Sequence, residues 1–169
     1  VWLGGDSAAT DGALNRTLIK DSKVFNKGEF VFGVCGLPKV MDALRFGMEL
    51  PVQSGGSARE FLVKTLVPSI RSGLKELDCV GADDGQLCFD GAILMGYRGE
   101  LFVLQGNFQL VKSADDFASV GSGSSHALGS LHSTIDEPDP KKRLMAALEA
   151  STRNAGCAPP FTFVSTKGR

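Results

Sequence analysis

The sequence has no excess of either charge and no long apolar run, and each absence argues against a class of protein. Eighteen basic residues stand against nineteen acidic ones, which gives a formal net charge of -1. Nucleic-acid binding depends on excess positive charge that neutralises phosphates, so we expect no nucleic-acid partner. No apolar segment has the length that a bilayer span requires, so we expect no membrane partner either.

Histidine and cysteine are also scarce. The two histidines, His126 and His132, do not share a helix face, and the four cysteines are scattered, so no metal site is predicted. The tripeptide Gly121-Ser122-Gly123 is too short for a nucleotide-binding fingerprint, so we expect no cofactor. The missing CxxC pair favours a reducing, cytoplasmic location, and the opening residues do not resemble a signal peptide.

Short apolar runs rich in β-branched and aromatic residues predict strands. They are Lys23 to Phe25, Phe30 to Cys35, Ala92 to Tyr97, Leu101 to Leu104, Phe108 to Lys112 and Phe161 to Ser165. Two pairs, Arg98-Gly99 and Gly106-Asn107, suit tight turns, so we expect an antiparallel meander around them. The opening residues are typical of the end of a further strand that enters a turn.

Helical periodicity marks four further segments. They are Pro38 to Leu50, Ser57 to Leu77, Ser124 to Thr134 and Pro140 to Asn154. Ser57 is a candidate N-cap, with Glu60 three residues later. Pro68 interrupts the apolar stripe of the second segment, which predicts a kink or a loosened turn near Thr65.

These elements alternate in blocks rather than one by one. Strands come first, then two helices, a run of strands, two helices and a closing strand, and no linker divides the 169 residues, so we expect a single domain. Periodicity alone gives an α+β class. Blocks of this kind favour antiparallel sheets packed face to face, and we predict a four-layer α-β-β-α sandwich of two antiparallel sheets.

Two ionisable residues near the start of the chain are candidates for one site. Asp6 follows Gly4-Gly5, and Lys23 precedes an apolar strand. Taken alone, Asp6 suits a turn cap and Lys23 suits a solvent-facing position. If the two meet in a partly buried cleft, the carboxylate holds the ammonium, and the positive charge favours the deprotonated form of a neighbouring nucleophile.

Five blocks extend this hypothesis along the chain: GGDSAATDG, SKVF, FVFGVCG, VGSGSSHALGSL and ALEASTRNAG. In this order and at these separations they resemble proteasome β subunits and their bacterial relative HslV, which are amino-terminal nucleophile (Ntn) hydrolases. The resemblance covers nearly the whole chain and implies a threonine peptidase. In that family a threonine at the mature amino terminus attacks the peptide bond, and its own α-amino group helps to move the proton. The family's first strand would precede Val1, so we expect one strand and the nucleophile upstream.

The resemblance assigns roles to individual residues. Asp6 matches the family's acid and Lys23 the lysine beside the nucleophile, although the segment between them is one residue longer than usual, which leaves Ser22 as an alternative alignment. Gly33 matches the residue whose backbone N–H stabilises the oxyanion. Ser122 matches the serine that hydrogen-bonds the terminal amine, but it also suits a plain glycine-rich turn.

Two positions depart from the family pattern. Asn154 and Cys157 stand where the family usually has aspartate and serine. An amide cannot supply the carboxylate's charge, and a thiol is a weak hydrogen-bond partner. We therefore expect either low activity or a support for the amine that is built differently.

The resemblance also implies substrate contacts. Thr10 matches a position whose main chain pairs with an extended substrate. Ala9, Val31, Cys35 and Lys39 match the surroundings of the first specificity pocket. Three of these four side chains are small or apolar, so we expect a hydrophobic residue before the cut.

The function that follows from the resemblance is a threonine-type endopeptidase. It would degrade unfolded polypeptides inside stacked homo-oligomeric rings, with an AAA+ ATPase unfoldase as a partner. Two alternatives stay open: an Ntn hydrolase of the same fold that acts on a small amide, and a catalytically inactive ring subunit.

Overall fold

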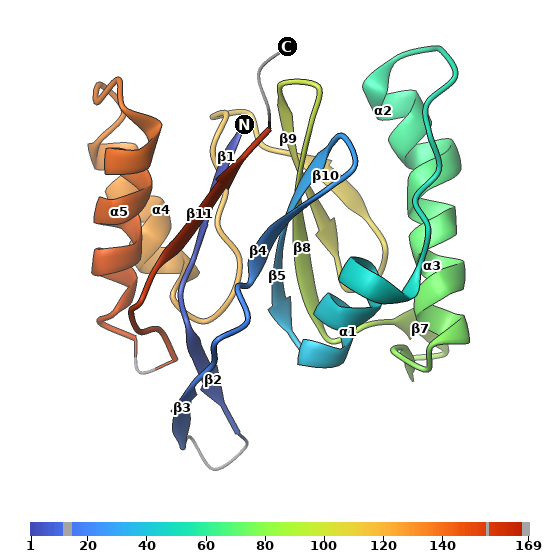
Figure 1. The fold of residues 1–169 in the computed structure, drawn as a ribbon, viewed down its shortest axis with the longest axis horizontal. Helices are drawn as coiled ribbons and strands as arrows, with labels where there is room; N and C mark the ends of the chain where they lie inside the picture. The colour runs from blue at the N-terminus through green and yellow to red at the C-terminus, as the bar shows by residue number, and fades with distance from the viewer. Residues whose placement is uncertain (12–14, 155, 167–169) are drawn as a thin grey trace.

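The computed structural model describes residues 1–11, 15–154 and 156–166. Figure 1 shows four layers: two helices, a small sheet, a larger sheet and a second group of helices. Every strand pair in both sheets is antiparallel. The predicted α+β class and the four-layer sandwich are therefore confirmed.

The larger sheet contains most of the predicted strands. It has five strands in the order β10-β9-β8-β5-β4. Their bounds are Val24–Lys27 (β4), Phe30–Gly36 (β5), Gly91–Tyr97 (β8), Glu100–Gln105 (β9) and Leu110–Lys112 (β10). Arg98 and Gly99, with φ of 47° and 83°, form the predicted tight turn between β8 and β9. β10 begins two residues later than predicted, because Phe108 has a φ of 64° and belongs to the preceding turn.

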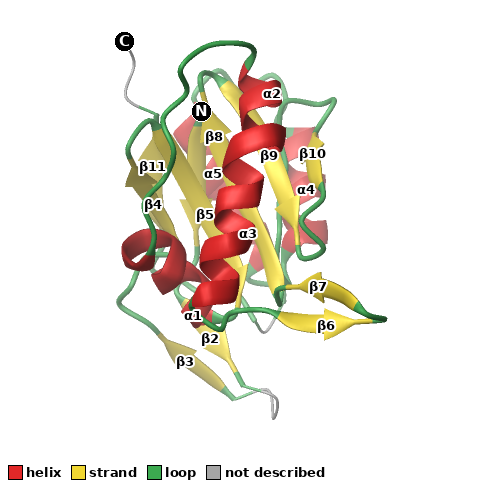
Figure 2. Cartoon of the chain, turned by 90° about the vertical axis from the view of Figure 1, so that its right-hand side faces the viewer, coloured by secondary structure: helices red, strands yellow, loops and turns green. Residues whose placement is uncertain are grey.

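The smaller sheet pairs the two ends of the described chain. β1 (Trp2–Gly5) runs antiparallel to β11 (Thr162–Ser165). Two hairpins that the sequence did not predict extend from one end of the molecule (Figures 1 and 2). One joins β2 (Ala8–Thr10) to β3 (Arg16–Leu18), and the other joins β6 (Gly81–Asp83) to β7 (Gln86–Cys88). Their strands are three residues long and mostly exposed, so they carry no apolar alternation.

One group of helices covers the outer face of the larger sheet (Figure 2). It comprises α1 (Pro38–Asp42), the π-helical turn η1 (Ala43–Gly47), α2 (Ala58–Phe61), the π-helical turn η2 (Leu62–Leu66) and α3 (Val67–Glu76). Ser57 caps α2 as predicted, since its side chain accepts a hydrogen bond from Glu60 N at 3.2 Å. The wide turn η2 contains Thr65 and ends just before Pro68, so the predicted loosened turn is confirmed. The first predicted helix ends at Gly47 rather than at Leu50.

The second group of helices covers the smaller sheet. It consists of α4 (Ser124–Ser133) and α5 (Pro140–Ser151), close to the predicted bounds. Asp139 caps α5 and accepts hydrogen bonds from Lys141 N and Lys142 N. Among the residues that the structure describes, no helix has the length and apolar character of a membrane span.

Alternation along β5 divides the core into two parts. Phe32 and Val34 face the outer helices, in a cluster that includes Leu44, Ile70 and Ile93. Val31 faces the smaller sheet, in a second cluster with Leu3, Val24 and Leu94. β5 is therefore packed on both faces, and its carboxyl end has a fixed position.

A close approach between two glycines fixes that end of β5 against β8. A Cβ atom at Gly91 would lie 2.0 Å from the carbonyl oxygen of Cys35, and one at Gly36 would lie 2.2 Å from the carbonyl oxygen of Asp90. Both residues also have positive φ, 119° and 100°. Only glycine satisfies both conditions, so this junction is a rigid part of the fold.

We predict that Gly91→Ala lowers the free energy of unfolding by about 3 kcal/mol or more, because it adds a backbone clash to the cost of a positive φ. Gly85→Ala is the matched control, since Gly85 has a φ of +77° and open space around it. It should cost only about 1 kcal/mol. Urea denaturation measures both, and equal costs would contradict this account of the junction.

Candidate active site

A cavity of about 520 Å³ lies where the two sheets meet the loop before α4. Its wall includes eight of the residues to which the sequence analysis gave a role. They are Asp6, Ala9, Thr10, Lys23, Gly33, Cys35, Ser122 and Cys157. Residues from distant parts of the chain thus share one cavity.

Asp6 and Lys23 form a partly buried ion pair in this wall. Lys23 Nζ donates to Asp6 Oδ1 at 2.8 Å, and the two side chains are 22% and 12% exposed, for Lys23 and Asp6 respectively. The other carboxylate oxygen, Oδ2, accepts hydrogen bonds from Ala8 N at 2.8 Å and from Ala158 N at 3.3 Å. These contacts fix both charged groups where β1 ends and β4 begins.

Ser22, the alternative to Lys23, has a different environment. Its Oγ donates to the carbonyl oxygen of Val24 at 2.7 Å and lies 2.7 Å from Oγ1 of Thr162. The hydroxyl therefore ties the start of β4 to β11. Of the two alignments, only the one through Lys23 places a side chain against Asp6.

The loop before α4 supplies Ser122. Its Oγ lies 3.9 Å from Cys157 Sγ, and its carbonyl oxygen accepts a hydrogen bond from Asn154 Nδ2 at 3.1 Å. Space here is tight, since a Cβ at Gly156 would lie 2.5 Å from Ser122 Oγ. Asn154 is half-buried and is not part of the cavity wall, and its side chain holds the main chain of Ser122.

A buried serine that the sequence analysis missed holds the same loop to α5. Ser151 Oγ donates to Ala147 O at 2.8 Å and to Gly123 O at 3.4 Å. Ser151 lies three residues before Asn154, at the end of α5. The sequence alone does not mark Ser151 as a site residue, because only the structure shows that its hydroxyl is buried. Ser151, the last residue of α5, and Asn154, in the turn after it, therefore both hold the Gly121-to-Gly123 loop.

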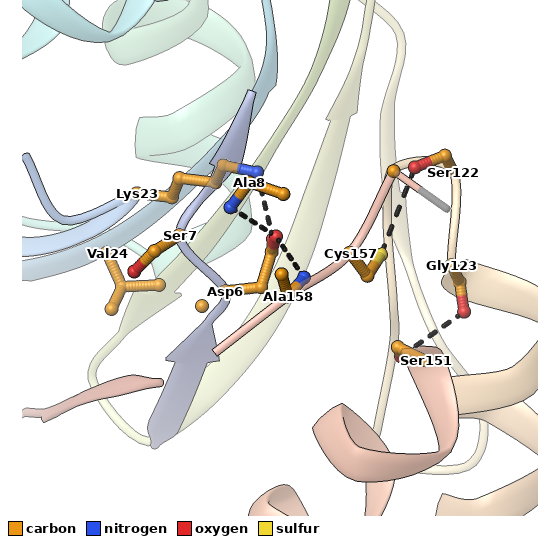
Figure 3. Close-up of polar contacts among 12 residues, drawn as sticks. Asp6, Ser7, Ala8, Lys23, Val24, Ser122, Gly123, Ser151, Cys157 and Ala158 are labelled. Atoms are coloured by element: carbon orange, nitrogen blue, oxygen red, sulfur yellow. Dashed lines mark hydrogen bonds and ion pairs between the residues drawn. The ribbon is translucent and has the colours of Figure 1, made fainter. Parts of the chain in front are cut away.

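Two adjacent residues join the ion pair to this loop. Ala158 N contacts the Asp6 carboxylate, while the thiol of its neighbour Cys157 faces Ser122, as Figure 3 shows. Asp6, Lys23 and Ser122 thus line one cavity, and the Cys157-Ala158 segment connects the ion pair to the Ser122 loop.

Gly33 lines the same cavity, but its N–H points toward the neighbouring strand of the larger sheet. Leu37 N donates to Asp90 O at 3.3 Å, and Val34 N donates to Lys23 O at 2.9 Å. Because hydrogen-bonding directions alternate along a strand, the N–H of Gly33 faces Leu94 of β8. The strand register therefore does not support the expectation that this N–H faces the reaction as an oxyanion donor.

The main chain of Thr10 faces away from its partner strand in the β2–β3 hairpin. Ile19 N donates to Ser7 O at 2.9 Å and Asp11 N donates to Asn15 O at 3.2 Å, so these residues form the bonded pairs of the β2–β3 hairpin. Alternation turns the N–H and C=O of Thr10 away from β3. In the described parts of the chain no strand occupies that edge of β2, which leaves it open to an extended peptide.

The four predicted pocket residues divide into two pairs. Ala9 and Cys35 line the cavity, whereas Val31 and Lys39 do not. Val31 is fully buried between the sheets, and Lys39 is exposed and donates to the carbonyl oxygen of Asp78 at 2.7 Å. Leu37 and Met41 line the cavity instead. Apolar periodicity does not identify these two residues, because the irregular turn before α1 decides which side chains face inward.

Cys35 contributes an apolar surface. Burial raises the pKa of its thiol, and the negative charge of Asp90 acts in the same direction. The thiol therefore stays neutral near pH 7. Within residues 1–11, 15–154 and 156–166 no cluster of three or more histidine, cysteine or acidic side chains could hold a metal.

The chain has the fold of HslV-like, proteasome-type subunits, which is an Ntn-hydrolase fold. BPH from Thiobacillus denitrificans, solved in complex with epoxomicin, matches with a TM-score of 0.74 at 17% identity, over 96% of this chain and 90% of that one. Eukaryotic HslV from Trypanosoma brucei matches with a TM-score of 0.63 at 15% identity, over 96% and 91%.

Anbu, described as an ancestral beta-subunit, from Yersinia bercovieri matches with a TM-score of 0.61 at 14% identity, over 98% and 80%. A scan of family models and a search of curated proteins gave no match. At these identities the likeness establishes the fold, and the sequence resemblance is confirmed at that level.

We predict that Asp6→Ala destabilises the protein more than Lys23→Met does. Without Asp6 a partly buried ammonium and two N–H groups lose their partner, which should cost about 2–4 kcal/mol. Without Lys23 the carboxylate keeps both N–H donors, so the cost should be about 1 kcal/mol. Urea denaturation measures both, and a larger cost for Lys23→Met would contradict the anchoring role of Asp6.

Proposed function

We propose that this protein is a threonine-type endopeptidase that degrades unfolded polypeptides inside stacked homo-oligomeric rings. The observation that supports it most is the Asp6–Lys23 ion pair, which lines the same cavity as Ser122. The fold shared with proteasome-type subunits supports it independently. The rings, the cytoplasmic location and an AAA+ ATPase unfoldase as partner come from the resemblance.

The nucleophile belongs to a strand that lies along β1 on the edge opposite β11. Among the described residues β1 pairs with β11 alone. A second cavity, of about 410 Å³, lies along β1, and Leu3, Leu94, Leu101 and Phe117 contribute to its wall. An apolar strand placed there would bury this surface and extend the smaller sheet. Its threonine would then lie beside Lys23.

The chemistry follows from these positions. The threonine hydroxyl attacks the peptide carbonyl and gives its proton to the threonine's own α-amino group, whose ordinary pKa is near neutral. The Lys23 ammonium, held by Asp6, favours the unprotonated amine and stabilises the developing negative charge. The amine returns the proton to the leaving nitrogen, and water then hydrolyses the acyl ester.

Other residues in and behind the wall position the reactants. Ser122 is the hydrogen-bond partner of the α-amino group, and Asn154 and Cys157 fix Ser122 without adding charge. The open edge of β2 at Thr10 pairs with the substrate main chain. An edge of this kind favours an extended polypeptide over a small amide.

A catalytically inactive ring subunit is the second candidate. Two observations favour it: the N–H of Gly33 faces β8, and Asn154 gives the Ser122 loop no negative charge. An active enzyme needs an oxyanion donor in addition to Lys23.

Epoxomicin labelling tests the proposal, since the BPH structure contains this inhibitor. We predict that the natural full-length protein is labelled on an amino-terminal threonine, and that Lys23→Met slows labelling about 100-fold or more. Ser22→Ala is the matched control and should keep the rate, because within the described ranges its hydroxyl hydrogen-bonds to Val24 and Thr162 rather than to the ion pair. Mass spectrometry locates the adduct.

The outcomes separate the candidates. Rings in negative-stain images without any adduct would favour the inactive subunit. An adduct on a residue other than the first, or equal rates for wild type and Lys23→Met, would contradict the mechanism. Turnover of small amides without turnover of peptides would favour the small-amide hydrolase.

A further inference from the structure

The charges of the cavity wall do not cancel. Three charged side chains line it: Asp6, Lys23 and Asp90. Asp6 and Lys23 neutralise each other at 2.8 Å. In the described part of the chain the carboxylate of Asp90 is exposed and makes no hydrogen bond or ion pair. The wall therefore carries one uncompensated negative charge, at Asp90.

The backbone of Asp90 has a fixed position beside β5. Its carbonyl oxygen accepts the hydrogen bond from Leu37 N at 3.3 Å. The close approach of Gly36 and Gly91 holds the residues on either side of this contact. Burial is the main cause of the raised pKa of the Cys35 thiol; the charge of Asp90 acts in the same direction and that of Lys23 against it, so both charged groups lie near this part of the wall.

The wall next to Asp90 is apolar. Leu37, Pro38 and Met41 follow Cys35 along the chain and line the same cavity. An apolar surface that ends in a carboxylate suits a long basic side chain, which lays its methylene groups on the wall and its charge beside the acid. A purely apolar side chain would cover this surface but would leave the acid unpaired.

We propose that this cavity selects polypeptide segments that carry lysine or arginine, and that Asp90 is the residue that recognises the basic group. The proposal rests on the proposed peptidase function and gives it a substrate class. It replaces the expectation of a simply hydrophobic residue before the cut.

Matched peptides test it. The natural full-length protein is given fluorogenic peptides that differ at one position. Lysine, glutamine or glutamate is placed in turn at each residue around the cut. At one position we expect kcat/KM to be about fivefold higher for lysine than for glutamine, as one partly screened ion pair provides. The ratio should shrink as salt is added.

Variants assign the effect to Asp90. Asp90→Asn should bring the lysine-to-glutamine ratio close to one, and Asp90→Lys should make glutamate the preferred residue. Asp83→Asn removes an exposed acid of β6 that does not line the cavity, and should keep the ratio. A ratio that stays the same in Asp90→Asn, or a preference for glutamate in the wild type, would overturn the proposal.

Fluorescence polarisation of the same peptides separates this proposal from the peptidase function, because binding needs no turnover. If the protein binds lysine peptides selectively, loses this selectivity in Asp90→Asn and cleaves no peptide, the recognition site is supported and the peptidase function is contradicted. Cleavage without selectivity for lysine would keep the enzyme and reject the recognition site.

Discussion

The carboxylate of Asp6 is the contact on which the candidate site depends. It binds the Lys23 ammonium with one oxygen and the N–H groups of Ala8 and Ala158 with the other. These three partners come from the first residue of β2, the residue just before β4 and the segment before β11. One side chain therefore ties three parts of the chain together at the cavity, and an uncharged substitute would satisfy fewer of them.

The rest of the site is arranged around this contact. Cys157 precedes Ala158, so the main-chain bond to Asp6 also sets the distance from Cys157 to Ser122. Asn154 and Ser151 hold the Ser122 loop from the end of α5. On the other side, the junction of Gly36 and Gly91 fixes the wall that carries Cys35 and Asp90. The Ser122 loop is thus held by close packing and hydrogen bonds, and not by a negative charge at position 154.

Much of the fold could be predicted from the sequence because the main strands and helices have clear apolar periods. The β2–β3 and β6–β7 hairpins could not, since their strands are short and exposed. Within the site, Asp6, Lys23 and Ser122 could be predicted because they lie in sequence motifs that occur in the same order as in the family. It could not give the direction of the Gly33 N–H, which depends on strand register, or the inward positions of Leu37 and Met41, which depend on an irregular turn.

The central claim is that a first strand along β1 places the nucleophile beside Lys23. A cryo-EM structure of the natural full-length protein tests it most directly. The account predicts a strand on the edge of β1 opposite β11, with a first-residue threonine whose hydroxyl or amine lies within hydrogen-bonding distance of Lys23 Nζ. A different segment on that edge, or a first residue far from Lys23, would contradict it.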